Sequence, residues 1–250
     1  MFTLQGHRIF VTGAGSGIDA AIAGRCALAQ ARLGLIDRNA AGLAAAAACG
    51  PQVVMHADDL GDAVGFRYNT ITYNALGRCD VLIANAGIGR VGTILQTTEA
   101  DLDRLWTVIV KSMFHLVQAL QPGMLAQQRG TVIVTASIGG VVGIRERLAY
   151  CTTKSALVGM VKCLPLDHAA NGVRFDAICP GRVGTPFVSQ RLTESADPVA
   201  ARAAMTATQA IGRMGTPDEI AAAAHSLASD DSTFVTGSEF IIDGASTAGK

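Results

Sequence analysis

The stretch that decides the fold is residues 8–18, Arg8-Ile9-Phe10-Val11-Thr12-Gly13-Ala14-Gly15-Ser16-Gly17-Ile18. Its first five residues predict a buried strand, and a helical pattern over 18–30 follows the glycines. Glycines let the backbone turn tightly and approach a pyrophosphate, whose charge then lies at the helix N-terminus. A glycine-rich turn alone is weak evidence, but its place between a strand and a helix predicts a dinucleotide site. The residues of this turn expected to contact the dinucleotide are Gly13, Ser16, Gly17 and Ile18.

Further strand-like runs alternate with longer helical stretches along the chain. These runs cover residues 33–37, 52–57, 80–84, 131–135, 173–179 and 240–242. Apolar strands that alternate with helices indicate a doubly wound parallel α/β sheet of about seven strands, with helices on both faces. No linker or repeat interrupts residues 1–250, which predicts a single domain. The stretch 185–210 lacks strand character and is long for a connection, so we expect a substrate lid there.

The composition excludes several classes of protein. The 250 residues carry 20 Lys+Arg against 20 Asp+Glu, and 50% of them are hydrophobic. This balance excludes intrinsic disorder and offers no surplus charge for nucleic acid or anionic lipid. No apolar run is long enough for a membrane span and no secretory signal opens the chain, so we expect a cytoplasmic protein. The six scattered cysteines form no C-x-x-C pair, which favours reduced thiols and no metal site.

Asp37 ends the second predicted strand, roughly twenty residues after the glycine turn. A carboxylate at this place can accept hydrogen bonds from both ribose hydroxyls of NAD, and it would repel the 2′-phosphate of NADP. Asp37 therefore favours NAD. The adjacent Arg38 weakens this interpretation, and a helix cap or an exposed loop acid is the alternative.

Tyr150 and Lys154 lie four residues apart, which places a phenol and an ammonium on one face of a predicted helix. A cation beside a phenol favours the phenolate and lowers the pKa of Tyr150 toward the range where it exchanges protons near neutrality. A Y-x-x-x-K pattern is common by chance. Its position after the strand that leads to Ser137 makes it more specific.

Together, these motifs resemble the short-chain dehydrogenase/reductase family of the classical type, over essentially the whole chain. The resemblance is carried by Thr12-Gly13-x-x-x-Gly17-Ile18, Asp59-Leu60, Asn85-Ala86-Gly87, Ser137, Tyr150-x-x-x-Lys154, Pro180-Gly181, Thr185 and Asp243-Gly244. It implies a Rossmann-like sheet and an NAD-dependent oxidoreductase that interconverts an alcohol and a carbonyl by hydride transfer. The segments 196–202 and 212–215 are similar to members that act on sugars and sugar acids, which suggests a small polar hydroxy compound as substrate.

The resemblance also implies roles for individual residues. Tyr150 would be the general acid/base, Ser137 would hydrogen-bond the reacting oxygen, and Lys154 would lower the pKa of Tyr150 and bind the nicotinamide ribose. The implied cofactor contacts are Asp59 with Leu60 beside the adenine, Asn85 and Gly87 on the adenosine side, and Val183 and Thr185 by the carboxamide. Members of the family are dimers or tetramers packed partly through the helix that bears Tyr150, so we expect a homotetramer or a dimer.

Four residues depart from the family pattern. Asp19 replaces the usual last glycine of the turn, where a carboxylate would cost about 1 kcal/mol or more beside a pyrophosphate, or would point to solvent and complement the helix N-terminus. Ala84 and Asp176 stand where asparagine is usual. Ile109 replaces the asparagine that holds a relay water, and its shape favours an unbroken helix. Either proton relay is impaired, or the water is held in another way, or the sequence is in error at these points.

Two other functions remain open at this point. Asp19 and Ile109 are compatible with a dinucleotide-binding protein that has little or no catalysis, and the fold also hosts NADP-linked reductases of lipid or steroid ketones. Arg145 and Arg147 precede Tyr150 in a loop that borders the substrate in this family. Either could hold a substrate carboxylate, or both are solvated loop charges.

Overall fold

The computed structural model describes residues 2–50, 52–60 and 75–249. Seven strands form one parallel sheet in the order β3-β2-β1-β4-β5-β6-β7. Their bounds are β1 Arg8–Thr12, β2 Arg32–Asp37, β3 Val53–Ala57, β4 Val81–Ala84, β5 Gly130–Thr135, β6 Val173–Pro180 and β7 Glu239–Ile242. The predicted doubly wound sheet is confirmed, and the ends of each strand lie within a residue of those expected.

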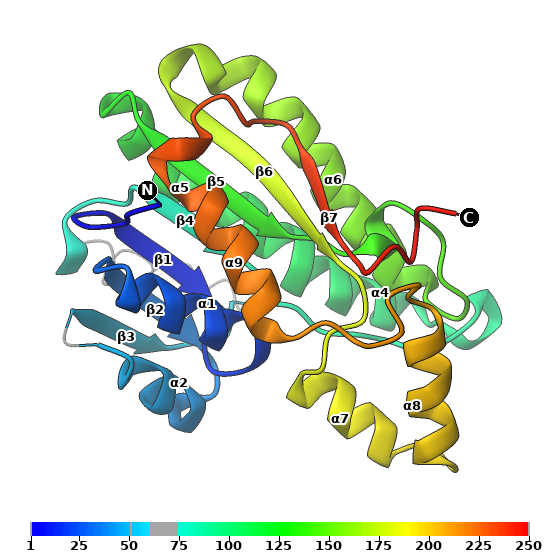
Figure 1. Ribbon diagram of the computed structural model, residues 1–250. Coiled ribbons are helices and arrows are strands. Elements are labelled where there is room, and N and C mark those ends of the chain that lie inside the picture. Colours follow the sequence, from blue (N-terminus) through cyan, green and yellow to red (C-terminus); the bar gives the residue numbers. More distant parts are fainter. Residues whose placement is uncertain (1, 51, 61–74, 250) are drawn as a thin grey trace.

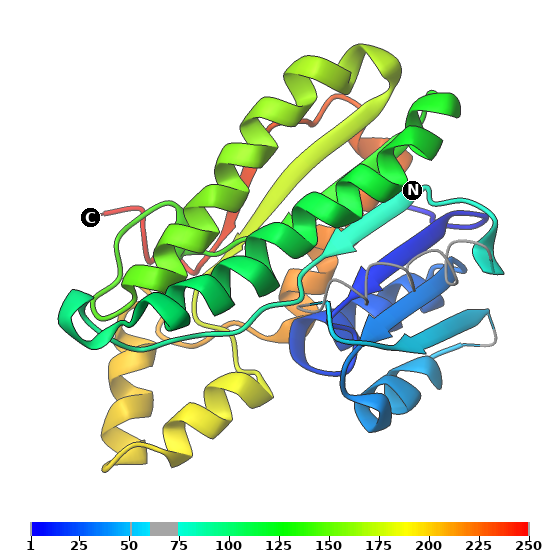
Figure 2. The ribbon, with the colours of Figure 1, turned by 180° about the vertical axis from the view of Figure 1, so that it is seen from behind.

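Both faces of the sheet are covered, which explains why its strands are apolar without alternation (Figures 1 and 2). Ile9 and Val11 pack on one face with α1 (Gly17–Leu28) and α9 (Pro217–Ala228). Phe10 points to the opposite face, where α5 (Ser112–Ala126) and α6 (Leu148–His168) lie. Neighbouring residues of one strand therefore belong to two separate cores.

The order of the strands reverses between β1 and β4. The chain builds β2, α2 (Ala40–Ala47) and β3 on one side of β1, then crosses back to β4 on the other side. Ligands of such sheets bind at the carboxyl ends of the strands next to this reversal. The glycine turn follows β1 at this place, and Asn85 follows β4.

The segment 185–210, which was predicted to form a substrate lid, is largely helical. It contains α7 (Pro186–Thr193) and α8 (Pro198–Ala207), and each begins with a proline after a capping side chain, Thr185 and Asp197. Figure 1 shows both helices beyond the carboxyl end of β6. None of the described helices is long and apolar enough to cross a membrane.

Candidate active site

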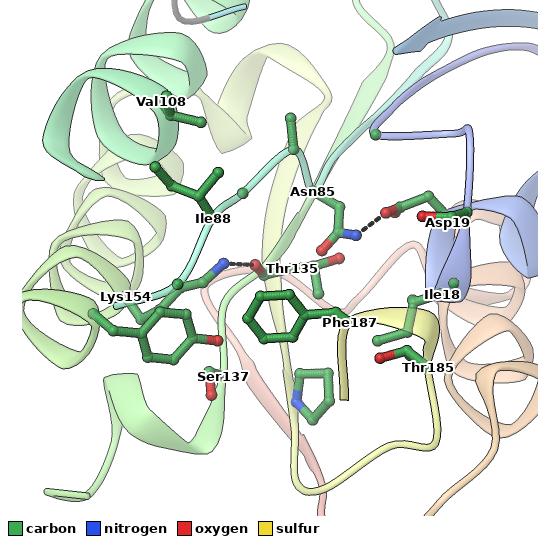
Figure 3. Close-up of a pocket in the computed structure, with 18 of the residues that line it drawn as sticks. Ile18, Asp19, Asn85, Ile88, Val108, Thr135, Ser137, Lys154, Thr185 and Phe187 are labelled. Carbon is green, nitrogen blue, oxygen red and sulfur yellow. Dashed lines mark hydrogen bonds between the residues drawn. The ribbon is translucent and has the colours of Figure 1, made fainter. Parts of the chain in front are cut away.

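A cavity of about 1040 Å³ opens at the carboxyl ends of the strands. It is lined by every residue that the sequence singled out for catalysis or cofactor binding: Gly13, Ser16, Gly17, Ile18, Asp37, Asp59, Leu60, Asn85, Gly87, Ser137, Tyr150, Lys154, Val183 and Thr185. Figure 3 shows several of these side chains around the cavity, carried by the glycine turn, the segment after β4, α6 and the start of the lid.

The glycine turn fits a dinucleotide. Gly13 has a φ of +79°, which favours glycine, and a Cβ at Gly15 would lie only 2.9 Å from the carboxylate of Asp37. Ser16 is the N-cap of α1, but its side chain accepts no capping hydrogen bond. The first N–H groups of α1 are therefore not capped by Ser16, and Gly17 and Ile18 line the cavity, which suits an anionic pyrophosphate.

Asp37 has a structural partner in this turn. Its Oδ2 accepts a hydrogen bond from the Gly15 N–H at 2.8 Å, and its Oδ1 accepts one from the Asn39 N–H at 2.8 Å. The carboxylate thus fastens the glycine turn to the end of β2 while it lines the cavity. The exposed Arg38 lines the cavity beside it.

Three polar side chains meet at the other end of the cavity. Lys154 is buried in α6, and its Nζ donates a hydrogen bond to the Thr135 carbonyl oxygen at 2.7 Å and lies 5.8 Å from the centre of the Tyr150 ring. Ser137 follows β5, and its Oγ accepts from the Gly139 N–H at 3.0 Å. Tyr150 is hydrogen-bonded with Ser137.

The expected depression of the Tyr150 pKa is wrong for the protein without cofactor. Burial raises the pKa of Tyr150, and the Ser137 hydrogen bond and the charges of Arg147 and Arg182 oppose this shift only in part. Burial also lowers the pKa of Lys154 to about 8, although Asp19 acts in the opposite direction. The cations that lower the Tyr150 pKa here, Arg147 and Arg182, were not foreseen from the sequence.

Asp19 is buried beside the glycine turn and lines the cavity, so of the two alternatives the one in which it points to solvent is wrong. It is 5% exposed, and its Oδ2 accepts a hydrogen bond from the Asn85 side-chain amide (Figure 3). Its Oδ1 is buried without a hydrogen-bond partner among the described residues. Burial is the largest cause that raises the pKa of Asp19 well above its usual value, against the Asn85 hydrogen bond and the charge of Lys154.

Asp19→Asn is expected to raise the melting temperature at neutral pH. Folding raises the pKa of the Asp19 carboxyl above its unfolded value of 3.8. The contribution of this group to stability is therefore fully present below pH 3.8 and is lost as the pH rises through the pKa of the folded protein. An asparagine is neutral at every pH and still accepts from Asn85. The variant's advantage should therefore vanish toward about pH 4, as thermal melts between about pH 4 and pH 8 would measure.

Asp218→Asn is the matched control, because Asp218 is an exposed carboxyl in the first turn of α9. It should give no stability gain at neutral pH. An Asp19→Asn protein with the wild-type melting temperature at every pH would contradict a carboxyl whose pKa is raised by burial.

Ile109 does not give the unbroken helix that was expected. It lies in a π-helical segment, Trp106–Lys111, between α4 (Glu99–Leu105) and α5. Its side chain is 2% exposed and belongs to the apolar core. The local widening of the helix therefore exists without an asparagine, and it is a property of the backbone packing here.

The other departures are structural. Ala84 is a buried residue at the end of β4. Asp176 is fully buried, pairs with Arg174 at 3.5 Å, and accepts a hydrogen bond from the Ser238 N–H at 3.0 Å, so it joins β6 to the segment before β7. Burial raises its pKa. It does not line the cavity.

The lid supplies residues that the sequence argument missed. Phe187 of α7 reaches the opposite wall, since a Cβ at Gly89 would lie 2.6 Å from its Cζ. Arg182 and Arg191 also line the cavity, as does Arg147, whereas Arg145 is exposed and does not. The available signals were the position of Arg182 directly after a strand and the four-residue spacing of Phe187 and Arg191 on one helix face.

Comparison with known proteins agrees with this geometry. Residues 13–247 match the family model described as "Enoyl-(Acyl carrier protein) reductase". The chain is 38% identical to the 2-keto-3-deoxy-L-fuconate dehydrogenase of Xanthomonas campestris pv. campestris, over 96% of this chain and 80% of that protein. It is 35% identical to the 2-(S)-hydroxypropyl-CoM dehydrogenase 3 of Xanthobacter autotrophicus, over 98% of each chain.

The fold has a close solved counterpart. The crystal structure of levodione reductase superposes with a TM-score of 0.95 over 99% of this chain and 100% of that one, at 30% identity. The named relatives are dehydrogenases and a reductase of a family that uses a nicotinamide dinucleotide, and the glycine turn and the cavity beside it fit that group. The protein therefore belongs to the classical short-chain dehydrogenase/reductase family and is an NAD(P)-dependent alcohol dehydrogenase or carbonyl reductase.

Proposed function

We propose that the protein is an NAD-dependent oxidoreductase that interconverts an alcohol and a carbonyl in a small polar hydroxy compound, with Ser137, Tyr150 and Lys154 as its catalytic residues. One observation carries the proposal. These three side chains line the same cavity as the glycine turn and Asp37, so a dinucleotide bound along the turn would extend toward Tyr150.

The nicotinamide ring, when bound, supplies or accepts the hydride, and the protein provides position and proton transfer. The Tyr150 hydroxyl takes the proton from an alcohol oxygen or donates it to a carbonyl oxygen. Ser137 holds the same oxygen by a hydrogen bond. Lys154, fixed by the Thr135 carbonyl, places a positive charge in the cavity beside the ribose, which favours the ionised form of Tyr150 once the dinucleotide is bound.

A spectrophotometric screen of sugars, sugar acids, polyols and steroids with NAD tests this function. Turnover of a sugar, sugar acid or polyol supports it. Binding of NAD without turnover anywhere in the panel would favour a dinucleotide-binding protein. Turnover restricted to steroids with NADP would favour a reductase of lipid ketones.

Wild-type protein is expected to have a higher kcat/KM with NAD than with NADP, because the 2′-phosphate would meet the Asp37 carboxylate. Asp37→Asn should lower this preference. Asp37 also holds the Gly15 N–H, so the variant should bind both cofactors more weakly, and the ratio of kcat/KM values is the proper measurement. Arg38→Ala should leave NAD use intact and reduce NADP use. A wild type that prefers NADP, or an unchanged ratio in Asp37→Asn, would refute the role of Asp37.

We also expect the chain to assemble as a homodimer or homotetramer, partly through α6. Large apolar side chains are exposed along the β7 edge and on α6: Leu166 at 87%, Phe234 at 103%, Phe240 at 42% and Ile241 at 43%. Exposed apolar groups of this size favour a protein–protein contact. Sedimentation velocity tests this expectation.

A further inference from the structure

Three arginines surround the substrate end of the cavity. Arg147 is the N-cap of α6, one turn before Tyr150, Arg182 follows β6, and Arg191 lies in the lid helix α7. All three line the cavity. The charges of Arg191 and Arg182 lower the pKa of Arg147, and the charge of Arg182 lowers the pKa of Arg191. Three positive charges in one place repel one another, so their arrangement is electrostatically unfavourable in the absence of a bound anion.

Arg147 is the most constrained of the three. It is 9% exposed, and its backbone forms a bridge with Gly92, while its Nη1 donates a hydrogen bond to the Arg90 carbonyl oxygen at 3.2 Å. A guanidinium has five N–H donors, and none of the Arg147 nitrogens is buried without a partner. Because Arg147 lines the cavity, its other donors are available to a ligand there. Burial, together with the charges of Arg191 and Arg182, lowers the pKa of Arg147 to about 10, so it stays cationic at neutral pH.

Within the described part of the chain, no carboxylate forms an ion pair with these arginines. Glu194, at the end of α7, is the acidic group that acts on Arg191, and its Oε1 accepts a hydrogen bond from Gln190. Arg191 instead lies over the Phe187 ring at 5.7 Å. Of the described residues, five acidic ones line the cavity: Asp37, Asp58 and Asp59 where β2 and β3 end, Asp19 in α1, which accepts from Asn85, and Asp103 in α4. None of these five forms an ion pair with the three arginines. A nearly buried cation without a counter-ion is costly unless a ligand supplies one.

We propose that Arg147, Arg182 and Arg191 form the binding site for a carboxylate of the substrate, so that the enzyme acts on hydroxy acids and oxo acids in preference to neutral alcohols. This inference rests on the proposed alcohol–carbonyl chemistry at Tyr150. A guanidinium binds a carboxylate through two parallel hydrogen bonds, which fixes orientation as well as position. Because Arg147 is one helical turn from Tyr150, the bound acid presents a nearby hydroxyl carbon to the catalytic residues. The Xanthomonas relative is named for a sugar acid, which agrees with this class.

Paired substrates that differ only in the charge of one group test the proposal. Pentonates, hexonates and 3-hydroxybutyrate are compared with their neutral amides in the NAD-coupled assay. The wild type should prefer the acids by about 10-fold or more in kcat/KM, as a charge-assisted hydrogen bond supplies. Arg147→Gln and Arg191→Gln should each lower kcat/KM for the acids by about 10- to 100-fold, with the Kd for NAD unchanged. Arg191→Gln should leave the amides unchanged, whereas Arg147→Gln, whose lost charge also acts on the Tyr150 pKa, should lower the amides less than the acids. Arg191 lies on a surface helix, so its variant should fold even where Arg147→Gln does not.

Arg145→Gln is the matched control, because Arg145 is two residues from Arg147 but is exposed outside the cavity. It should behave as wild type. Arg147→Lys keeps the charge but loses the paired donors, so it should fall between the wild type and Arg147→Gln. Equal turnover of acids and amides by the wild type, or equal losses in Arg145→Gln and Arg147→Gln, would overturn the carboxylate site.

A binding measurement separates this site from the proposed catalysis. Calorimetry with malonate, succinate and neutral malonamide, in the presence of NAD, needs no turnover. The two dicarboxylates should bind to the wild type and to Tyr150→Phe but not to Arg147→Gln, and malonamide should bind to none of them. Dicarboxylate binding without turnover of any substrate would support the carboxylate site and contradict the proposed reaction. Turnover without dicarboxylate binding would overturn the carboxylate site alone.

Discussion

Tyr150→Phe is expected to lower kcat by about 10²- to 10⁴-fold, which is the contribution of a positioned general acid or base. The substitution removes only the hydroxyl, while the ring, its packing on α6 and the glycine turn stay in place. Steady-state rates with the substrate found in the screen measure the effect. Burial raises the Tyr150 pKa in the free protein, so wild-type oxidation should also accelerate as the pH rises and the phenol loses its proton.

Thr152→Ser is the control for Tyr150→Phe. Thr152 is exposed on the same helix, and its Oγ1 donates to the Leu148 carbonyl oxygen at 2.9 Å. A serine keeps that hydrogen bond, so the control should retain wild-type rates. A Tyr150→Phe protein that retains more than about a tenth of kcat would be incompatible with Tyr150 as the proton-transfer group.

Lys154→Met should have the second large effect, a loss of about 10²- to 10³-fold in kcat/KM. Methionine preserves the length of the side chain but removes the charge and the hydrogen bond to the Thr135 carbonyl. No other lysine lines the cavity among the described residues, and Lys154 is the cation that would bind the nicotinamide ribose.

The same variant should reveal the energetic cost of the buried lysine. Burial lowers the Lys154 pKa from 10.5 to about 8, so the unfolded chain binds the proton more tightly between these two values. The cost of burying the charge is present below about pH 8 and is relieved as the pH rises toward 10.5. A shift of this size corresponds to about 3 kcal/mol. Urea unfolding should therefore show the wild type gaining stability relative to Lys154→Met across this pH range.

Lys162→Met on the same helix is the comparison for both readouts. Lys162 is half-exposed and pairs with Glu239 at 3.0 Å. Its loss should leave kcat/KM unchanged and should produce no stability gain of the wild type between about pH 8 and pH 10. Parallel stability curves for wild type and Lys154→Met would contradict a strongly depressed Lys154 pKa.

The fold was predictable because its signal is repeated along the chain. Each strand is a short apolar run such as residues 8–12 or 131–135, bounded by turn residues, and the parallel order of strands follows from alternation with helices. The sequence Thr216-Pro217-Asp218-Glu219 also indicates a helix start, and the capping box between Thr216 and Glu219 forms in the structure.

The site was predictable where it depends on local motifs and not where it depends on packing. Glycine turns, Asp37, Ser137, Tyr150 and Lys154 are fixed by their distance from strand ends, so their gathering around one cavity follows from topology. The direction of the Asp19 side chain was not predictable, because it depends on Asn85 across the sheet.

The gathering of Arg147, Arg182 and Arg191 was also not predictable from the sequence. Arg182 and Arg191 come from the end of β6 and from the lid, and only the packing of the lid on the cavity brings them to Arg147. The two helices of the predicted lid were not foreseen, although Thr185 and Asp197 each precede a proline, which is a helix-start signal. A single sequence offers no signal for a cluster whose members are distant in the chain.

Two measurements on the same preparations of wild type and Tyr150→Phe test whether Tyr150 transfers the proton to or from a substrate oxidised by NAD. Calorimetric titration gives the Kd for NAD, and a rapid-mixing experiment gives the rate of nicotinamide reduction in a single turnover. Both proteins should bind NAD with the same Kd. The single-turnover rate should be about 10²- to 10⁴-fold lower in Tyr150→Phe. A wild type that does not bind NAD, or a variant that reduces NAD within about tenfold of the wild-type rate, would contradict the proposed role of Tyr150 in an NAD-dependent reaction.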